Sequence, residues 1–269
     1  MITIKNYVKA ASLEEAWELN QKRTAQVIGG MLWVRMGNKN IQTVIDLSEL
    51  GLDQIEETDD EYRIGCMVTL RQLEMNASLE TYTDGAMKEA LKHIVGVQFR
   101  NLATVGGSIY GRFGFSDVLT IFLAMDSYVE LYKGGIVSMQ EFAQMPYDND
   151  ILVRIIIKKS KEKLAYQSVR PAKTDFPTLT CAISRDVSGD EEVYRIAVGA
   201  RPSKAMIVVD EKGILKEGLT EKSIRQFAEY AAEQVPTESN MRGSAKYRTH
   251  LVKVLVMRVL ESLKGEETC

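Results

Sequence analysis

The hydrophobic and polar positions in the first part of the chain predict short strands that alternate with helices. Ser12 and Glu15 form a capping box ahead of apolar residues that fall on one face of a helix. Strand patterns lie at residues 2–4, 25–28, 43–47, around 55, and at 62–67, 128–132 and 151–157. Helical patterns lie near residues 69–75 and 84–94. Ser116 caps another helix at residues 117–125, which is apolar nearly all round and is therefore expected to be buried.

The composition turns strongly basic at residues 158–161, and longer strands follow. Strand patterns at residues 164–169, 178–185, 193–200 and 205–209 have the regular spacing of an antiparallel sheet. Thr220 and Ser244 each cap a closing helix with one apolar face. We predict a first domain at residues 1–160, with two lobes at about 1–52 and 53–160, and a C-terminal α/β domain at 161–269. Residues 265–269 are expected to form a frayed tail.

Two segments are interpreted as strands that end in a pair of glycines, Gly29-Gly30 and Gly106-Gly107. Glycine lets the backbone adopt a positive φ and lets a ligand approach the main chain. Successive backbone N–H groups in such a turn can bind an anion, such as a phosphate or pyrophosphate. Two facing turns could hold a pyrophosphate from both sides, although a single pair is more often only a tight turn.

The other motifs along the chain exclude several nucleotide and catalytic sites. Neither G-x-G-x-x-G nor G-x-x-x-x-G-K-[ST] occurs, so a Rossmann site and a P-loop have no support. Ser108 is not a credible nucleophile, because Tyr110 interrupts the nucleophile-elbow pattern and no suitable histidine is near in sequence. Asp117 begins the buried helix, where it either complements the helix dipole or accepts hydrogen bonds from ligand hydroxyls, such as a ribityl chain.

Composition and charge limit the partners, the location and the cofactor sites that the chain can have. The chain has 269 residues, of which 45% are hydrophobic and 26% charged, and a net charge of −3, which disfavours nucleic acid or an anionic membrane as partner. The start lacks the pattern of a secretory signal, and no apolar run could span a membrane, so a cytoplasmic location is expected. Three scattered cysteines and two histidines predict neither a metal site nor an iron–sulfur cluster, so any redox chemistry must come from an organic cofactor or a partner.

Residues 100–109 read R-N-L-A-T-V-G-G-S-I and resemble the R-N-x-A-T-[IV]-G-G-N-I motif of the FAD subunit of molybdenum hydroxylases, the xanthine and carbon monoxide dehydrogenase family. Ile28-Gly29-Gly30 is similar to that family's first pyrophosphate loop, A-G-G-T-D-L. Further similarity lies at Ser116-Asp117 and at residues 123–131, 197–205 and 242–248. The matches run along the chain in one order, which makes them far more specific than either glycine pair alone.

The resemblance implies a fold of the α/β (α+β) class, with a two-part FAD-binding domain and a smaller C-terminal domain of antiparallel sheet and helices. It also implies one non-covalently bound FAD and no catalytic or metal-binding residue in this chain. A molybdopterin-binding large subunit would oxidise the substrate, and a [2Fe–2S] small subunit would relay electrons to the flavin. The flavin would then pass them to NAD⁺ or another acceptor.

The family's cofactor-binding positions carry over by alignment of the motifs. The first loop would contribute Ile28, Gly29, Gly30, Met31, Leu32 and Trp33. The second loop would contribute Thr104, Gly106, Gly107, Ser108 and Tyr110. Asp117 takes the place that contacts the ribityl chain, Leu152 takes an apolar place near the isoalloxazine ring, and Gln167 falls where a lysine is often found beside the flavin.

Three departures from the family pattern bear on the cofactor. Met31-Leu32 replaces a polar pair, so only backbone donors remain for the phosphates. Phe113-Gly114-Phe115 stands where a proline-containing turn is common. Gln167 cannot supply a full positive charge, and it is expected to stabilise an anionic reduced flavin less than lysine does.

Three alternatives to this function stay open. A flavin-free assembly protein of the same fold would explain the altered first loop. A self-sufficient flavoenzyme of related fold, such as a cell-wall enolpyruvyl reductase, would need a positioned acid or base, which the sequence does not reveal. A sugar-nucleotide binder would require only one phosphate loop.

Overall fold

The computed structural model describes residues 1–189, 191–216 and 218–264 of the chain. Its internal contacts divide it into two compact units, each of which is built from three separate segments of the sequence. The first unit comprises residues 1–72, 97–111 and 127–158, and the second comprises residues 73–96, 112–126 and 159 onward. The predicted tail at residues 265–269 lies outside the described residues.

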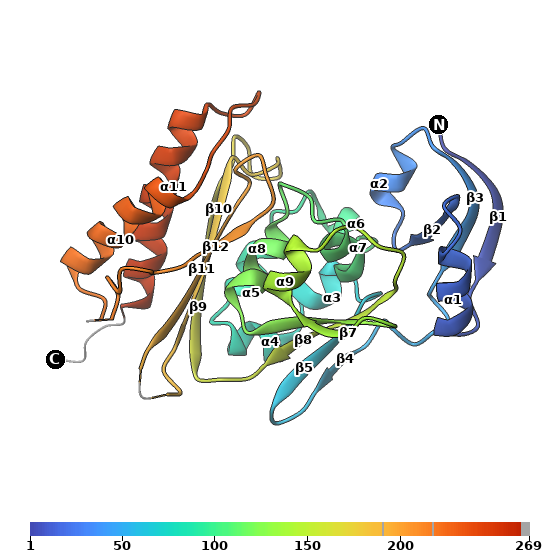
Figure 1. Cartoon of the computed structure of the whole chain (residues 1–269), viewed down its shortest axis with the longest axis horizontal. Helices are drawn as coiled ribbons and strands as arrows, with labels where there is room; N and C mark the ends of the chain where they lie inside the picture. The colour runs from blue at the N-terminus through green and yellow to red at the C-terminus, as the bar shows by residue number, and fades with distance from the viewer. Residues whose placement is uncertain (190, 217, 265–269) are drawn as a thin grey trace. The chain divides into compact units, whose positions relative to one another are not determined.

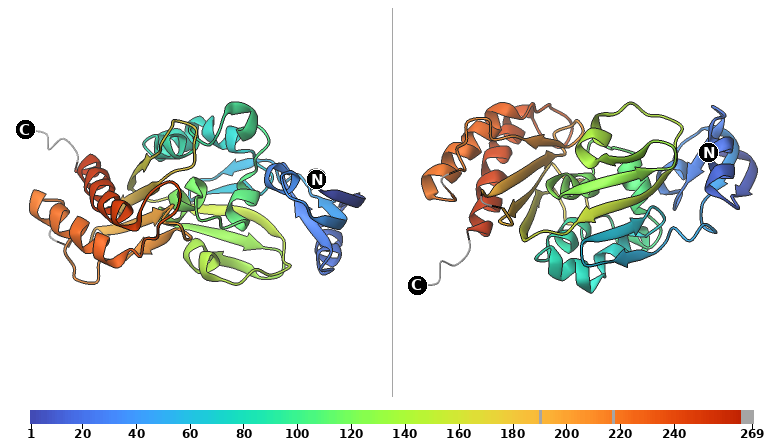
Figure 2. Two further views of the ribbon diagram at one scale, coloured as in Figure 1. Left: turned by 90° about the horizontal axis from the view of Figure 1, so that it is seen from above. Right: turned by 60° about the horizontal axis from the view of Figure 1, so that its bottom comes forward.

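The first unit begins with a three-stranded parallel sheet in the order β1-β3-β2, and α1 packs on β2 and β3 (Figure 2). The elements of this part are β1 (Thr3–Lys9), α1 (Leu13–Asn20), β2 (Ala25–Ile28), α2 (Leu32–Arg35) and β3 (Asn40–Asp46). Ser12 caps α1 by accepting from the Glu15 N–H at 3.1 Å. The predicted capping box is wrong in its second half, because the Glu15 carboxylate accepts from the N–H of Ala11 instead, at 2.7 Å.

A five-stranded antiparallel sheet in the order β4-β5-β8-β6-β7 forms the larger part of the first unit (Figure 1). Its strands are β4 (Ile55–Glu57), β5 (Glu61–Gly65), β6 (Ser127–Leu131), β7 (Gly135–Ser138) and β8 (Leu152–Lys158). The helices along this stretch of chain are α3 (Leu70–Glu74), α6 (Val97–Arg100), α7 (Val105–Tyr110) and α9 (Met139–Gln144). α7 lies against β8, so the second glycine pair is attached to the central strand of this sheet.

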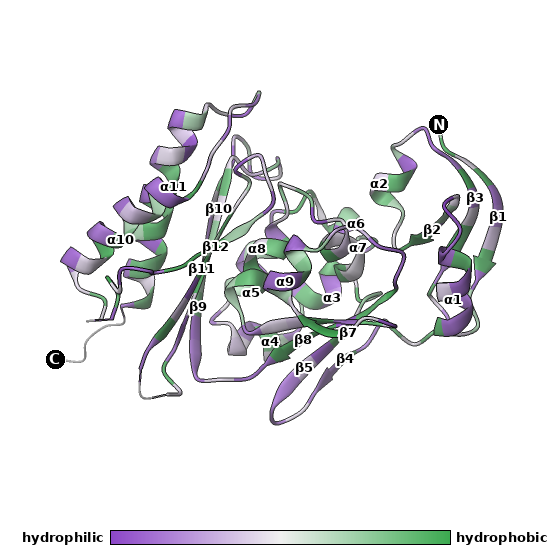
Figure 3. Ribbon diagram, in the orientation of Figure 1, coloured by the Kyte–Doolittle hydropathy of each residue, from purple (hydrophilic) through white to green (hydrophobic). Residues whose placement is uncertain are grey.

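The second unit is built on an antiparallel sheet in the order β12-β11-β10-β9. Its elements are α4 (Ala77–Tyr82), α5 (Ala86–Leu91), α8 (Asp117–Ala124), β9 (Glu162–Val169), β10 (Leu179–Asp186), β11 (Val193–Gly199), β12 (Met206–Val208), α10 (Glu221–Gln234) and α11 (Ala245–Leu263). α5 and α8 pack on one face of this sheet, and α11 with α10 covers the other (Figure 1). α10 and α11 carry both hydrophobic and hydrophilic residues along their length, as expected of helices with one buried face (Figure 3).

The mixed α/β class and the antiparallel C-terminal sheet are confirmed. Every residue of α8 is buried, as its apolar sequence predicts. The short elements α2, α4, β7 and α9 are not predicted, because each has too few residues to show a period. Among the described residues, no helix has the length and apolarity that crossing a membrane requires.

Candidate cofactor-binding site

The first glycine pair packs directly against the segment that precedes α7, within the first unit. A Cβ at Gly30 would lie 2.5 Å from the carbonyl carbon of Leu102 and closer still to its oxygen. A Cβ at Gly29 would lie 3.1 Å from Cγ2 of Thr104 and closer still to its hydroxyl. Neither glycine has a positive φ. They are therefore required for the close approach of the two loops and not, as predicted, for a left-handed backbone.

The residue that adopts the left-handed conformation in the first loop is Met31, with φ 58°. A bulky side chain rarely adopts this region, and such residues cluster at ligand-binding sites. The Met31 side chain packs against the small core of Ile28, Ile41 and Val44. Packing of this side chain therefore holds the turn in a shape that the backbone alone disfavours.

The second glycine pair does not end a strand, so that prediction is wrong. Both glycines lie in the first turn of α7, and Thr104 caps this helix by accepting from the Gly107 N–H at 3.2 Å. A Cβ at Gly106 would lie 2.7 Å from the carbonyl oxygen of Cys66, so this glycine lets α7 start against the chain that follows β5. A Cβ at Gly107 would lie 3.1 Å from the Thr104 hydroxyl, and outside α7 itself no further atom of the described residues would lie within 4 Å of it.

The two loops differ in how their backbone donors are used. The N–H groups of Val105 and Gly106 donate to the carbonyls of Val68 and Cys66 at 2.8 and 2.9 Å. Within the described ranges of the chain, no backbone or side-chain group accepts from the N–H groups of residues 29–31. Donors for an anion are thus uncommitted in the first loop, whereas those at the start of α7 are engaged by the protein itself.

The side chains of Ser108 and Tyr110 have partners in the first unit. The Ser108 hydroxyl donates to the Thr104 carbonyl at 2.9 Å, and the Tyr110 hydroxyl donates to the Asp148 carbonyl at 2.6 Å. Leu152 opens β8 opposite Leu131 of β6 and is buried. These contacts fix the surroundings of α7 and leave the predicted ligand roles of Ser108, Tyr110 and Leu152 as predictions.

Asp117 begins α8 in the second unit, where its side chain is only 6% exposed. Its Oδ1 accepts hydrogen bonds from the Tyr166 hydroxyl and from Nη2 of Arg170. The helix cap is provided by Ser116, whose hydroxyl accepts from the Leu119 N–H at 3.0 Å. Burial raises the pKa of the Asp117 carboxyl to about 6, and Arg170 opposes this rise.

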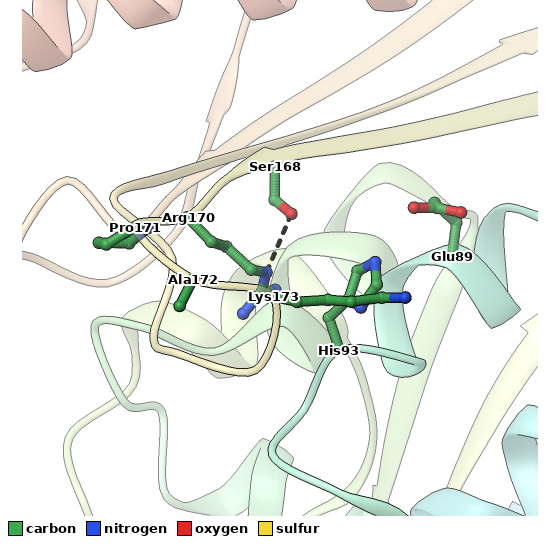
Figure 4. A pocket seen from close by; sticks show the side chains of 7 residues that line it. All are labelled: Glu89, His93, Ser168, Arg170, Pro171, Ala172 and Lys173. Atoms are coloured by element: carbon green, nitrogen blue, oxygen red, sulfur yellow. Dashed lines mark hydrogen bonds between the residues drawn. The ribbon is translucent and has the colours of Figure 1, made fainter.

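Arg170 is held by further bonds within the second unit. Its Nη1 donates to the Asp175 carbonyl at 2.8 Å, and its Nε donates to the Ser168 hydroxyl at 3.2 Å. Arg170 also lines an open hollow with a cavity volume of about 290 Å³ (Figure 4). The other residues that line the hollow are Glu89, His93, Ser168, Pro171, Ala172 and Lys173. Gln167 lies on β9 opposite Cys181 of β10 and is half-buried.

The sequence did not reveal the partners of Asp117. Arg170 follows it by 53 residues and Tyr166 by 49, and neither belongs to a recognised motif. One signal was available, since a carboxylate on a helix buried all round requires a cationic partner or a donor. Among the described residues, no group of three or more His, Cys, Asp or Glu side chains is placed to hold a metal ion.

Two places, each taken within its own unit, suit separate parts of an FAD. A pyrophosphate needs backbone or cationic donors, and the first loop offers N–H groups that no described residue uses. A dinucleotide's hydroxyls need acceptors, and Asp117 is a buried carboxylate paired with an arginine.

Comparison with known proteins identifies the class. The family described as the FAD binding domain in molybdopterin dehydrogenase matches residues 2–159, and the CO dehydrogenase flavoprotein C-terminal domain matches residues 164–263. The chain therefore belongs to the FAD-binding flavoproteins of the molybdenum hydroxylase family, which are oxidoreductase subunits.

Individual relatives are distant but match almost end to end. The chain is 26% identical over 261 residues to the uncharacterised protein YgfM of Escherichia coli K12, with 94% of each chain covered. It is 24% identical to the glyceraldehyde dehydrogenase medium chain of Sulfolobus acidocaldarius, covering 96% of this chain and 98% of that one. A chain of the Cu,Mo-CO dehydrogenase crystal structure has the same fold, with a TM-score of 0.86, 21% identity and coverage of 98% and 99%.

Proposed function

We propose that the chain binds one FAD non-covalently and passes electrons from the [2Fe–2S] centres of a partner subunit to NAD⁺ or another acceptor. The observation that carries this proposal is the docked pair of glycine loops, in which the N–H groups of Gly29, Gly30 and Met31 are not used by the described protein. Bound FAD supplies the electron-transfer chemistry, and the residues of this chain bind and orient it.

Each part of the proposed site has a distinct task. The backbone of residues 28–33 donates to the pyrophosphate, because the side chains of Met31 and Leu32 cannot. At α7, Gly107 leaves room for the phosphates beside Thr104. In the second unit, Asp117 accepts from ribityl hydroxyls. Leu152 offers an apolar contact to the isoalloxazine ring, and Gln167 stabilises an anionic reduced flavin less than a lysine would.

The proposed partners are the other subunits of a molybdenum hydroxylase. Substrate oxidation requires a molybdopterin-binding large subunit, and electron relay requires a [2Fe–2S] small subunit. The name of the Sulfolobus relative, a medium chain, supports assembly with other subunits. A net charge of −3 supports neither nucleic acid nor an anionic membrane as a partner, and we propose a cytoplasmic location.

A second candidate is a flavin-free assembly subunit of such a complex. The apolar side chains of Met31 and Leu32 favour it, because they remove side-chain donors from the first loop. The two candidates differ in one measurable property. The proposed flavoprotein binds FAD in a stoichiometry of about one per chain and shows the flavin absorbance bands, whereas the assembly subunit shows neither.

The test of electron transfer uses the purified, FAD-loaded chain without air. Dithionite, and NADH where a nicotinamide is the acceptor, should reduce the flavin, and an artificial dye should reoxidise it. Purines, aldehydes and similar heterocycles should leave the flavin oxidised until the molybdopterin and [2Fe–2S] subunits are added. Rapid bleaching by one of these substrates with the chain alone would contradict the proposal.

A further inference from the structure

The carboxylate of Asp117 is held by two donors on one oxygen. Tyr166 OH and Arg170 Nη2 both donate to Oδ1, and the side chains of Asp117 and Arg170 are each 6% exposed. Tyr166 is a neutral donor that orients the carboxylate, whereas Arg170 also neutralises its charge. The two contacts therefore fix different properties of the same group.

Arg170 cannot readily turn away from Asp117. Its Nε donates to Ser168 on β9, and its Nη1 donates to the main chain at Asp175, so the planar guanidinium is held at three positions. Asp117 itself begins a helix that is buried along its whole length. The pair thus joins α8 to β9 and to the segment that follows it.

Stability of the fold does not account for this pair. Ser116 already caps α8, so the helix start does not need the carboxylate. A buried ion pair commonly stabilises no more than apolar residues of similar size, because removing both charges from water is costly. A task in ligand binding gives a physical reason to bury and fix this carboxylate.

We propose that Arg170 is a positioning residue of the flavin site, which keeps Asp117 ionised and fixes it as an acceptor for a hydroxyl of the bound cofactor. This inference rests on the proposed function, in which Asp117 contacts the ribityl chain. Arg170 is not assigned a contact with the cofactor. Its effect passes through the Asp117 carboxylate.

The pH dependence separates this role from simple packing. Burial raises the pKa of Asp117 to about 6, and the charge of Arg170 lowers it, so loss of this charge moves the pKa further up. Tyr166 faces the same oxygen, and burial keeps its own pKa well above the usual value, so it stays protonated. His93 and Glu89 line the hollow together with Arg170, and burial lowers the pKa of His93.

Asp126 and Lys173 are further charged groups of the second unit. Asp126 follows the helix and faces Arg195 of β11 at 3.9 Å. Lys173 lines the hollow from the segment after β9. These groups belong to every variant below, so a shift between variants reports on Arg170.

The experiment measures FAD dissociation constants of the full-length apoprotein between pH 5 and pH 9, for wild type, Arg170→Met, Arg170→Lys and Tyr166→Phe. Wild type should bind with constant affinity above pH 7 and lose affinity as the pH falls through about 6. Arg170→Met should move the midpoint up by about two pH units, which weakens binding about tenfold at pH 7, and affinity should return toward pH 9. Arg170→Lys should restore the wild-type midpoint, and Tyr166→Phe should weaken binding with a smaller shift.

Arg242→Met is the matched control, because Arg242 pairs with Asp175 at 3.3 Å in the same region and does not touch Asp117. It should leave the midpoint unchanged. A second readout, the carbon NMR shift of the Asp117 carboxyl in the apoprotein, follows its titration without any cofactor. An unchanged titration in Arg170→Met, or an affinity loss equal at all pH values, would overturn the inference. Absence of FAD binding by wild type would instead overturn the proposed function, and the flavin role of Arg170 with it.

Discussion

Replacing Gly30 with alanine tests whether the two glycine loops are docked as described. The new Cβ would lie 2.5 Å from the carbonyl carbon of Leu102, whereas carbon atoms in contact are about 3.5–4.0 Å apart. The first loop must therefore move by about 1 Å, because a backbone carbonyl cannot rotate aside as a side chain can. Overpacking of this kind costs about 1–3 kcal/mol, and a clash with backbone belongs at the upper end.

The same change should weaken cofactor binding more than it weakens the fold. A hydrogen bond to a charged group contributes about 1.5–3 kcal/mol, and a displaced loop would lose at least two such bonds to the pyrophosphate. The FAD dissociation constant should therefore rise at least about 100-fold. Affinity is measured by titrating FAD into the apoprotein and following the quenching of flavin fluorescence.

Alanine substitutions at Gly29 and Gly37 should have smaller effects on stability than Gly30→Ala. A Cβ at Gly29 would displace the Thr104 side chain, which would lose its cap on α7, so the fold should lose about 1 kcal/mol. A Cβ at Gly37 would lie 3.3 Å from the Val34 carbonyl, which requires a shift of only a few tenths of an ångström, and its alanine variant is the control. Both tryptophans, Trp17 and Trp33, lie in this part of the first unit, so urea unfolding followed by their fluorescence reports on it. If the Gly30→Ala variant unfolds at the same urea concentration as wild type and binds FAD with the same affinity, the docked arrangement of the loops is refuted.

Three further changes have defined outcomes. Gly107→Asp should abolish FAD binding, measured by flavin absorbance after gel filtration. Gly189→Asp adds the same charge where a Cβ makes only an ordinary contact, with the Glu191 carbonyl at 3.8 Å, and should not. Burial raises the pKa of Glu162 from 4.5 to about 7, so the folded state binds this proton more tightly, and the free energy of unfolding should fall by roughly 3 kcal/mol as the pH rises from 4.5 through 7. Glu162→Gln should remove that part of the pH dependence in urea titrations. Arg248→Met should lower the melting temperature sharply, because its buried guanidinium binds the carbonyls of Thr178, Glu238 and Gly243.

The sequence predicts best those elements that are long enough to show a period. β9 to β12, α10 and α11 lie where alternation and helical spacing place them, and α8 is buried as its composition indicates. The domain boundary near residue 160 stays a prediction. The first family match ends at residue 159 and the second begins at residue 164. The compact units are divided differently, because residues 73–96 and 112–126 belong to the second unit although they precede residue 160.

The helix α7, which contains the second glycine pair, could not be predicted from its local sequence. Thr104-Val105 has the composition of a strand, and two glycines oppose a helix by about 1 kcal/mol each. The helix forms because Thr104 caps it and because Val68 and Cys66 accept from its first N–H groups. Those acceptors lie almost 40 residues earlier in the chain, so no local pattern could reveal them.

The apolar first loop has a consistent physical explanation under the proposed function. Met31 and Leu32 give up side-chain donors, but the shape of the loop depends on the close approach of Gly29 and Gly30 and on the packing of Met31 in the small core. Backbone N–H groups in a fixed turn bind phosphate whatever side chains flank them. Affinity for FAD should therefore depend on the glycines far more than on the polarity of residues 31 and 32.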